Sequence, residues 1–247
     1  MMNFNRKVIF LTGSNGNLGK SLIGYFLQYN CKIIALDKDK IKAKNNKISF
    51  YQVDFNNINN LKIVLNLIKK KFNKIDFIIN NAGLTHFNVK KNELNSFSLE
   101  KWSSSLNINL ISADLIIREL SEKMPKKNDS SILNVASIYG CLKPDFSIYK
   151  NTEIVNSLEY AASKAAIIQL TKWYSGKLCP IRINSISPGG IFNNHKKKFV
   201  NQYSSKTLLK RMAKKEEIIN SMIFLLSNNA SYITGENIIV DGGFLSR

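Results

Sequence analysis

The sequence predicts one α/β domain, residues 1–247, with a doubly wound parallel sheet and helices on both of its faces. Short apolar runs alternate with helical patterns along the chain. Most of these runs are apolar at nearly every position, as in strands that are covered on both sides. A glycine-rich turn follows the first run. A chain of 247 residues fits one sizeable domain of this kind.

The distribution of charge along the chain argues against a nucleic-acid-binding protein. The formal net charge of +19 could indicate a nucleic-acid or membrane-surface protein. However, the lysines are scattered over nearly every predicted helix, and no nucleic-acid-binding motif is present. We interpret the charge as a compositional bias that gives a basic surface, which would attract acidic or phosphorylated substrates. We therefore expect no specific nucleic-acid partner.

The cysteines and the apolar segments predict the compartment. Cys31, Cys141 and Cys179 are odd in number and show no metal-ligand spacing, which favours reduced thiols and no metal site. No apolar run reaches 18 residues. We expect a cytoplasmic protein that does not enter a membrane.

The first predicted strand, Lys7–Leu11, runs directly into a glycine-rich turn and then a helix. In this order, backbone N–H groups and a helix N-terminus form an anion site that suits a dinucleotide pyrophosphate. A glycine-rich turn without a ligand is an equally common alternative. The residues of the turn expected to bind the cofactor are Gly13, Asn15, Asn17, Leu18 and Gly19.

The second strand, Lys32–Leu36, ends at Asp37, about twenty residues after the turn. A carboxylate here can accept hydrogen bonds from both ribose hydroxyls and would repel a 2′-phosphate. Asp37 therefore favours NAD over NADP. The neighbouring Lys38 leaves NADP open, because a cation could tolerate the phosphate.

The third strand, Ile48–Val53, ends at Asp54 and Phe55, and Asp54 would cap the next turn or reach the adenine amino group. A helix over Ile58–Phe72 leads to a fourth strand, Phe77–Ile79. Ligands of such sheets bind beyond the carboxyl ends of the strands. The residues after the fourth strand are therefore further cofactor candidates, namely Asn81, Ala82 and Gly83.

A long helix is predicted over Leu99–Lys123, and Asn109 lies in its interior among apolar residues. Such an asparagine is most often a hydrogen-bonded structural residue. The fifth strand, Ile132–Val135, ends close to Ser137, which places a hydroxyl at the carboxyl edge of the sheet.

The segment Ile138–Ser157 shows no clean periodicity and is long for a connection, which indicates a functional loop. Its middle would cover the substrate, while a surface excursion or a subunit contact is the alternative. Two aromatic and three polar side chains are candidates for sugar contacts: Tyr139 and Tyr149, with Asp145, Asn151 and Thr152.

A helix over Leu158–Lys177 carries Tyr160 and Lys164 one turn apart on one face. A nearby cation favours the phenolate, so we expect it to lower the pKa of Tyr160 from its usual value near 10. The pattern by itself is common in helices, where it usually marks a half-buried tyrosine beside a solvated lysine. The apolar stripe expected to face the core is Ala161, Ala165, Ile168, Trp173 and Leu178.

The remaining segments complete the sheet. The sixth strand, Ile181–Ile186, is followed by Pro188 and Gly189, which we expect near the cofactor together with Ile191. The segment Ile191–Lys206 is predicted to be a mobile basic flap. A helix over Glu216–Leu226 and a last strand over Asn237–Val240 end the pattern.

Together, these motifs resemble the short-chain dehydrogenase/reductase family along the whole chain. They appear in the family's order: the turn Thr12–Gly19, Asp54, Asn80–Gly83, Asn109, Ser137, Tyr160 with Lys164, Pro188-Gly189 and Gly242-Gly243. The resemblance implies a Rossmann-type sheet of order 3-2-1-4-5-6-7 and hydride transfer with a nicotinamide. It assigns the acid/base role to Tyr160 and a hydrogen bond to the substrate oxygen to Ser137. It further implies that Lys164 lowers the tyrosine pKa and holds the ribose, and that Asn109 holds a relay water.

Three departures from the family pattern concern the cofactor and the substrate. Asn17 stands where the single-domain branch usually has glycine, and the glycine spacing matches the sugar-nucleotide branch. Asn193 stands where many members have a threonine. About ten extra residues separate Ser137 from Tyr160, which affects the substrate pocket more than the chemistry.

The C-terminal half is most similar to oxidoreductases associated with flagellin modification and nonulosonate biosynthesis. We therefore expect a sugar or sugar-derived substrate. A 3-oxoacyl-thioester reductase, a sugar-nucleotide epimerase or dehydratase, and a non-catalytic dinucleotide-binding module are the alternatives. The resemblance also implies a homodimer or homotetramer, assembled through Leu99–Lys123 and Leu158–Leu178.

Overall fold

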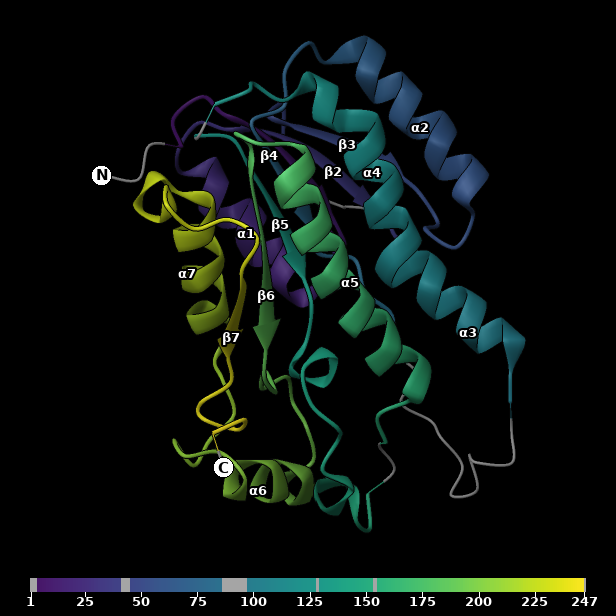
Figure 1. Ribbon diagram of the computed structural model, residues 1–247, viewed down its shortest axis with the longest axis vertical. Helices are drawn as coiled ribbons and strands as arrows, with labels where there is room; N and C mark the ends of the chain where they lie inside the picture. Colours follow the sequence, from purple (N-terminus) through teal and green to yellow (C-terminus); the bar gives the residue numbers. More distant parts are fainter. Residues whose placement is uncertain (1–3, 41–44, 86–96, 128, 153–154, 247) are drawn as a thin grey trace.

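The computed structural model describes residues 4–40, 45–85, 97–127, 129–152 and 155–246. Seven parallel strands form one sheet of order β3-β2-β1-β4-β5-β6-β7, as predicted (Figure 1). Each predicted strand is present, with ends that differ from the expected ones by two residues at most. The strands are β1 Val8–Thr12, β2 Lys32–Asp37, β3 Ile48–Gln52, β4 Phe77–Asn80, β5 Ser131–Val135, β6 Arg182–Pro188 and β7 Asn237–Val240.

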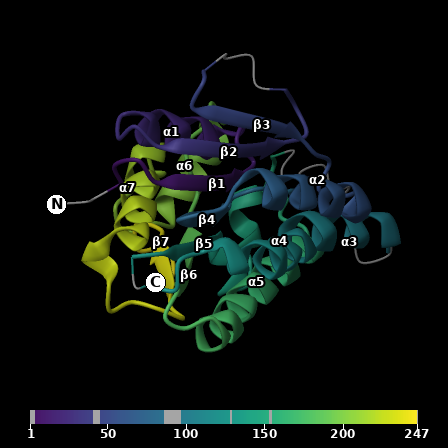
Figure 2. The same ribbon diagram turned by 90° about the horizontal axis from the view of Figure 1, so that it is seen from above.

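Helices cover both faces of the sheet (Figure 2). On one face, α1 (Asn17–Leu27) packs beside α7 (Lys215–Leu226) over a core that includes Phe26. The other face carries α2 Ile58–Lys71, α4 Ser112–Leu120 and α5 Leu158–Lys177. Because both faces are covered, the central strands are buried on both sides, which explains their continuous apolar sequences.

The long helix predicted over Leu99–Lys123 is present but is not α-helical throughout. It consists of α3 (Leu99–Leu106), a π-helical turn (Asn107–Ile111), α4 and a final 3₁₀ turn. Asn109 lies inside the π-helical turn. π-helical turns inside α-helices occur frequently at functional sites.

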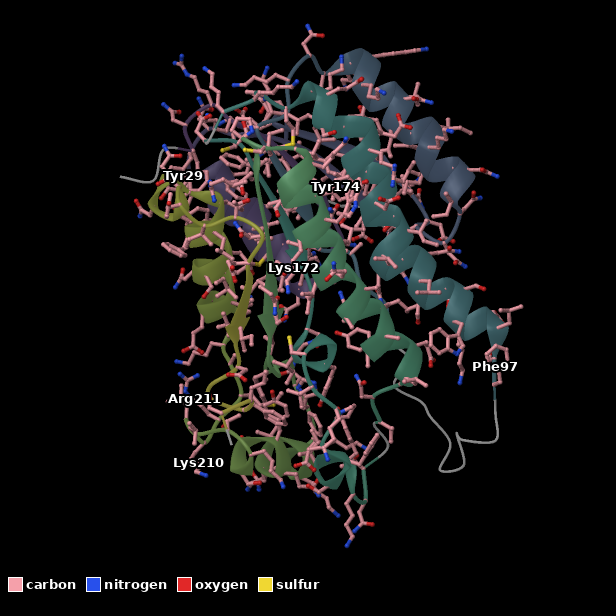
Figure 3. All side chains as sticks on the ribbon, viewed as in Figure 1. Tyr29, Phe97, Lys172, Tyr174, Lys210 and Arg211 are labelled. Carbon is pink, nitrogen blue, oxygen red and sulfur yellow. The ribbon has the colours of Figure 1, made fainter. Side chains whose placement is uncertain are left out.

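The core-facing side of α5 differs from the prediction. Trp173, placed on the buried stripe, is 57% exposed, and Ala165 is exposed as well. The buried face instead carries polar side chains with hydrogen-bond partners, including Ser163 and Thr171. Tyr174 projects from α5 toward α4 and donates a 2.6 Å hydrogen bond to Asp114 (Figure 3). The predicted apolar stripe is therefore split: Ala165 and Trp173 face solvent, whereas Ile168 and Leu178 pack against the core.

A buried row of polar side chains joins α5 to two strands. Asn80 Nδ2 in β4 donates to Asn134 Oδ1 in β5 over 2.8 Å. Asn134 Nδ2 donates in turn to Thr171 Oγ1 over 2.9 Å. We refer to these three residues as the Asn80 row.

The expected mobile flap Ile191–Lys206 contains a helix, α6 (Lys197–Ser205), at the lower end of Figure 1. The helix is held by its two buried rings, Phe199 and Tyr203. These rings pack with Tyr149 and Phe244 in a satellite cluster. The segment predicted as a mobile basic flap therefore contains a regular helix that the sequence pattern did not indicate.

Within the described part of the chain, no helix combines the length and apolarity needed to cross a bilayer.

Candidate active site

The glycine-rich turn lies where β1 ends and α1 begins, at the carboxyl edge of the sheet. Gly13 has a φ of +63°, a conformation that side-chain-bearing residues rarely adopt. A Cβ atom on Gly19 would lie 2.1 Å from the Gly13 carbonyl oxygen. The turn is braced by Asn81, whose Nδ2 donates to the Thr12 and Gly13 carbonyls over 3.1 and 3.0 Å.

Asp37, at the end of β2, is buried beside this turn. Its Oδ2 accepts a 2.8 Å hydrogen bond from the Asn15 backbone N–H, and its Oδ1 accepts from Asp39 N–H over 3.1 Å. The carboxylate is thus fixed next to the turn, as predicted for a ribose-binding group. Asp54 is exposed and accepts from the Asn56 backbone N–H over 2.9 Å. Of its two expected roles, the cap of the next turn is observed.

Lys164 and Tyr160 project from the first two turns of α5. The Lys164 Nζ donates to the Val135 carbonyl over 2.7 Å and lies 5.8 Å from the centroid of the Tyr160 ring. Burial lowers the pKa of Lys164 to about 8. Because this ammonium is bonded to a carbonyl and is itself hard to keep charged, its effect on the phenol is limited.

The expected lowering of the Tyr160 pKa is not observed in the structure. Burial raises the pKa of this phenol, and a hydrogen bond with the Ser137 hydroxyl acts in the opposite direction. Desolvation disfavours the phenolate more strongly than the hydrogen bond favours it. The contact with Ser137 does bring together the two hydroxyls predicted to act on one substrate oxygen.

Asn109 lies close to Lys164, and both side chains approach Gly83: a Cβ atom added there would lie 3.5 Å from Lys164 Nζ and 3.7 Å from Asn109 Oδ1. Its Nδ2 donates to Ser163 Oγ over 2.9 Å and to the Leu84 carbonyl over 3.0 Å. Its Oδ1 accepts from the Leu84 N–H over 2.7 Å. Both Nδ2 hydrogens are therefore donated to protein atoms, whereas Oδ1 accepts one of the two hydrogen bonds that an amide oxygen can accept.

A cavity of about 350 Å³ lies at the carboxyl edge of the sheet and gathers half of the predicted site residues. The predicted residues that line it are Leu18, Asn81, Gly83, Ser137, Tyr160, Lys164, Pro188, Gly189 and Ile191. The other predicted residues do not line it. Gly13, Asn15, Asn17 and Gly19 belong to the turn, and Ala82 follows β4. Asp37, Asp54 and Asn109 make the contacts described above. Phe55 is buried in the hydrophobic core under α2 and α4, away from the cavity.

The cavity is also lined by residues that the sequence patterns do not predict: Leu84, Thr85, Asn156, His195, Phe199, Tyr203 and Met212. They come from loops and from α6, where no periodic signal singled them out. The hydroxyl oxygen of Tyr203 accepts a 2.5 Å hydrogen bond from the Gly190 N–H, which ties α6 to the segment after β6. His195 Nδ1 accepts from Asn193 N–H over 3.2 Å.

Only part of the expected sugar-contacting set in the loop Ile138–Ser157 faces the cavity. Tyr139 and Tyr149 line it, and their hydroxyls are 2.5 Å apart. Asp145 instead forms a 2.9 Å ion pair with Lys206 and accepts from Ser147. The Thr152 hydroxyl donates to the Tyr149 carbonyl over 2.8 Å, and the backbone of Asn151 is left-handed. Asp145, Asn151 and Thr152 are not among the lining residues, so they brace the loop.

These contacts fit a dinucleotide. The turn leaves no room for side chains at Gly13 and Gly19, which keeps its backbone open to a pyrophosphate. Asp37 stands beside the turn at the distance in sequence expected for a ribose contact. The cavity begins at Leu18 and ends at the reactive hydroxyls, so a nicotinamide would reach the catalytic groups.

Comparisons with known proteins agree with this geometry. A family model described as enoyl-(acyl carrier protein) reductase, one of the short-chain dehydrogenase/reductase models, matches residues 32–245. The chain is 29% identical to the post-translational flagellin modification protein A of Campylobacter coli, over 96% of this chain and 98% of that protein. It is 30% identical to a 3-oxoacyl-(acyl-carrier-protein) reductase of Thermotoga maritima, over 99% of this chain and 100% of that protein.

Solved structures give the same result. The chain is similar to a short-chain dehydrogenase from Leptospira borgpetersenii with bound NAD⁺, with a TM-score of 0.86 and 31% identity. The similarity covers 98% of this chain and 94% of that one.

Proposed function

Because the chain belongs to the short-chain dehydrogenase/reductase family and is an NAD(P)-binding oxidoreductase, we propose that its substrate is a sugar or sugar-derived intermediate of surface-glycan biosynthesis. In this proposal, hydride is transferred between the nicotinamide and a substrate carbon that bears a hydroxyl or carbonyl group. The observation that carries it is the meeting of Ser137, Tyr160 and Lys164 in one cavity that begins beside the glycine-rich turn.

Each of these side chains has a proposed role. Tyr160 is the general acid in reduction and the general base in oxidation, exchanging a proton with the substrate oxygen. Ser137 donates a hydrogen bond to the same oxygen and stabilises the charge that develops there. Lys164 is a hydrogen-bond donor for the nicotinamide ribose, and its charge contributes only modestly beside the phenol. The bound nicotinamide supplies or accepts the hydride.

Asn109 receives a positioning role in this proposal. Its amide joins Leu84, which lines the cavity, to Ser163, which immediately precedes Lys164. This connection holds the π-helical turn, the segment after β4 and α5 in a fixed relation. A relay water would bind at the second acceptor position of Asn109 Oδ1, because both Nδ2 hydrogens are already donated.

We propose NAD as the preferred cofactor. Asp37 is buried next to the turn with its carboxylate fixed by two backbone N–H groups. A 2′-phosphate would place a second negative charge against this group, and at about 4 Å two charges interact by about 4 kcal/mol under protein-surface conditions. The solved relative with bound NAD⁺ supports the same preference.

We propose a homodimer or homotetramer that forms through α3, α4 and α5. The solvent-facing side of α5 carries Leu158 and Trp173, which are 71% and 57% exposed. Leu99 and Ile111, on the neighbouring helical segment, are exposed as well. Apolar groups gathered on adjacent helices are typical of a surface that a partner covers.

A second candidate is the reduction of 3-oxoacyl thioesters on an acyl carrier protein. The Thermotoga maritima relative has this activity by name, and the net charge of +19 would favour an acidic carrier. A substrate screen distinguishes the sugar substrate from the acyl thioester. The purified protein is mixed with NADH or NADPH and with either a panel of keto sugars or acetoacetyl thioesters, and the absorbance of the reduced cofactor is recorded. Turnover of the thioesters alone would replace the sugar proposal.

A further inference from the structure

Asn156 is a polar side chain in the wall of the active-site cavity that the mechanism above does not use. It is 7% exposed and lines the same cavity as Ser137 and Tyr160. Its Oδ1 is buried and has no hydrogen-bond partner in the described structure. A buried acceptor without a partner costs roughly 1–3 kcal/mol. This position therefore points to a donor that the polypeptide does not provide.

The position of Asn156 is fixed by the start of α5. The next residue, Ser157, caps the helix, and its Oγ accepts from the Tyr160 N–H over 3.4 Å. Asn156 and the Tyr160 hydroxyl are thus carried by one short, capped segment. Across the cavity wall, the buried hydroxyl oxygen of Thr85 also has no partner among the described residues.

The hydrogen-bonding chemistry of Asn156, compared with that of Ser137 and Tyr160, indicates which functional groups the substrate carries. Tyr160 and Ser137 donate to the oxygen of the reacting carbonyl, whereas an amide oxygen only accepts. A substrate that uses Asn156 together with the two hydroxyls must offer a carbonyl and an O–H donor. We propose that Asn156 is a specificity-determining residue that accepts a hydrogen bond from a hydroxyl on the carbon next to the reacting carbon. The inference rests on the proposed oxidoreductase function and identifies the substrate as an α-hydroxy carbonyl compound, or a vicinal diol in the oxidative direction.

The rest of the wall agrees with a small substrate that carries no positive charge. No aspartate or glutamate is among the described residues that line the cavity. Tyr139 and Tyr149 are hydrogen-bonded to each other, and burial raises the pKa of both phenols, so they stay neutral. The volume of about 350 Å³ is near the lower end for ligand pockets, roughly 300–1,000 Å³, and it must also admit a nicotinamide. A long acyl chain fits this space poorly.

A matched pair of ketones tests the inference. The probes are 3-hydroxybutan-2-one and butan-2-one, which differ by one hydroxyl next to the carbonyl, each reduced with NADH. We expect wild-type kcat/KM to be roughly tenfold higher for the hydroxy ketone, the effect of one hydrogen bond. Asn156→Leu should reduce this ratio to about one, and Asn156→Ala serves if the leucine variant does not fold. Asn151→Gly, in the same loop but outside the cavity, should keep the wild-type ratio.

Binding provides a second readout that does not depend on turnover. The affinity of both ketones for the NADH-saturated protein is measured by calorimetry in a Tyr160→Phe background, which does not turn over, with and without each Asn156 substitution. A hydroxyl-dependent difference that persists in both Asn156 variants, or no difference in wild type by either readout, would overturn the role of Asn156. Failure of every carbonyl probe to oxidise bound NADH would instead refute the proposed function, while the binding ratios would still decide the role of Asn156.

Discussion

The Lys164 ammonium donates a 2.7 Å hydrogen bond to the carbonyl of Val135, the last residue of β5. This contact links the helix that carries the tyrosine to the strand that leads to Ser137. The lysine is almost completely buried, and burial lowers its pKa to about 8 from an ordinary 10.5. The link is therefore made by a cation that loses its proton within an accessible pH range.

The first prediction concerns stability between pH 8 and 10.5. The native pKa of Lys164 lies below its unfolded value, so in this window the unfolded chain holds a proton that the native protein lacks. The free energy of unfolding should then rise with pH through the contribution of Lys164, by no more than about 3 kcal/mol. Denaturant unfolding of wild type and Lys164→Met at pH 7 and 9.5 isolates this contribution. An equal pH dependence in both proteins would contradict it.

The second prediction separates the roles of Tyr160 and Lys164. Tyr160→Phe should lower kcat by a factor of about 10² or more, because it removes the proton donor of the substrate oxygen. Its affinity for NADH should change little, since the turn and Asp37 are untouched. Lys164→Ala should reduce both turnover and NADH affinity. Stopped-flow turnover and fluorescence titration with NADH measure the two effects, and an active Tyr160→Phe enzyme would refute the assigned chemistry.

The third prediction concerns cofactor choice. Asp37→Ser should shift the ratio of kcat/KM for NADH and NADPH toward NADPH by at least roughly tenfold, because a buried negative charge is removed and Lys38 remains. Asp37→Asn is the matched control for shape, since an amide oxygen can still accept from Asn15 N–H. It should show the same direction of change with a better-preserved turn. A wild type that already prefers NADPH would assign the dominant role to Lys38.

The fourth prediction compares two glycines of α1. Gly19→Ala would place a Cβ 2.1 Å from the Gly13 carbonyl oxygen, so it should distort the turn and abolish NADH binding. At Gly24 nothing lies within 4 Å of an added Cβ. Gly24→Ala should raise the free energy of unfolding by about 0.5–1 kcal/mol, the helix propensity difference, and leave NADH binding intact. Calorimetric titration measures the NADH affinity of each variant, and urea unfolding measures its free energy of unfolding. Normal NADH affinity in Gly19→Ala would contradict the close packing of the turn.

The fifth prediction addresses assembly. Trp173→Glu should weaken self-association, because a charge replaces an exposed indole at the centre of the proposed interface on α5. Ile63→Glu is the control, since Ile63 is similarly exposed but lies on α2. Sedimentation velocity at micromolar concentration compares both variants with wild type. A monomeric wild type would remove the basis for this interface.

Much of the fold could be predicted because its strands are short apolar runs between clear turn and helix signals. The sheet order followed from the family resemblance and is confirmed. The side of α5 that faces the core could not be derived from hydrophobicity, since Ser163, Lys164 and Thr171 are buried through hydrogen bonds that depend on residues distant in sequence. Apolar periodicity detects only burial that is driven by apolar contacts.

The site residues that lie close together in the sequence were predicted. Those that the tertiary structure brings together from distant segments were missed. Tyr160 and Lys164 are a turn apart on one helix, so their proximity is local. Asn156 and Phe199 reach the same cavity only because the loop Ile138–Ser157 packs against α6. The helix α6 itself was missed, because it is short, basic and held by only two buried rings.

The Asn80 row has a consequence for how the strands find their partners. Neighbouring parallel strands that are apolar at every position can slide along each other without exposing a polar group, so their sequences specify the alignment weakly. Asn80 and Asn134 change this, because a shift of one residue would separate their amides and leave Asn80 Nδ2 and Asn134 Oδ1 unpaired in a dry interior. The pair thereby penalises each misaligned sheet during folding. The carboxyl edge, on which every catalytic group depends, is set in place by two amides that never contact the substrate.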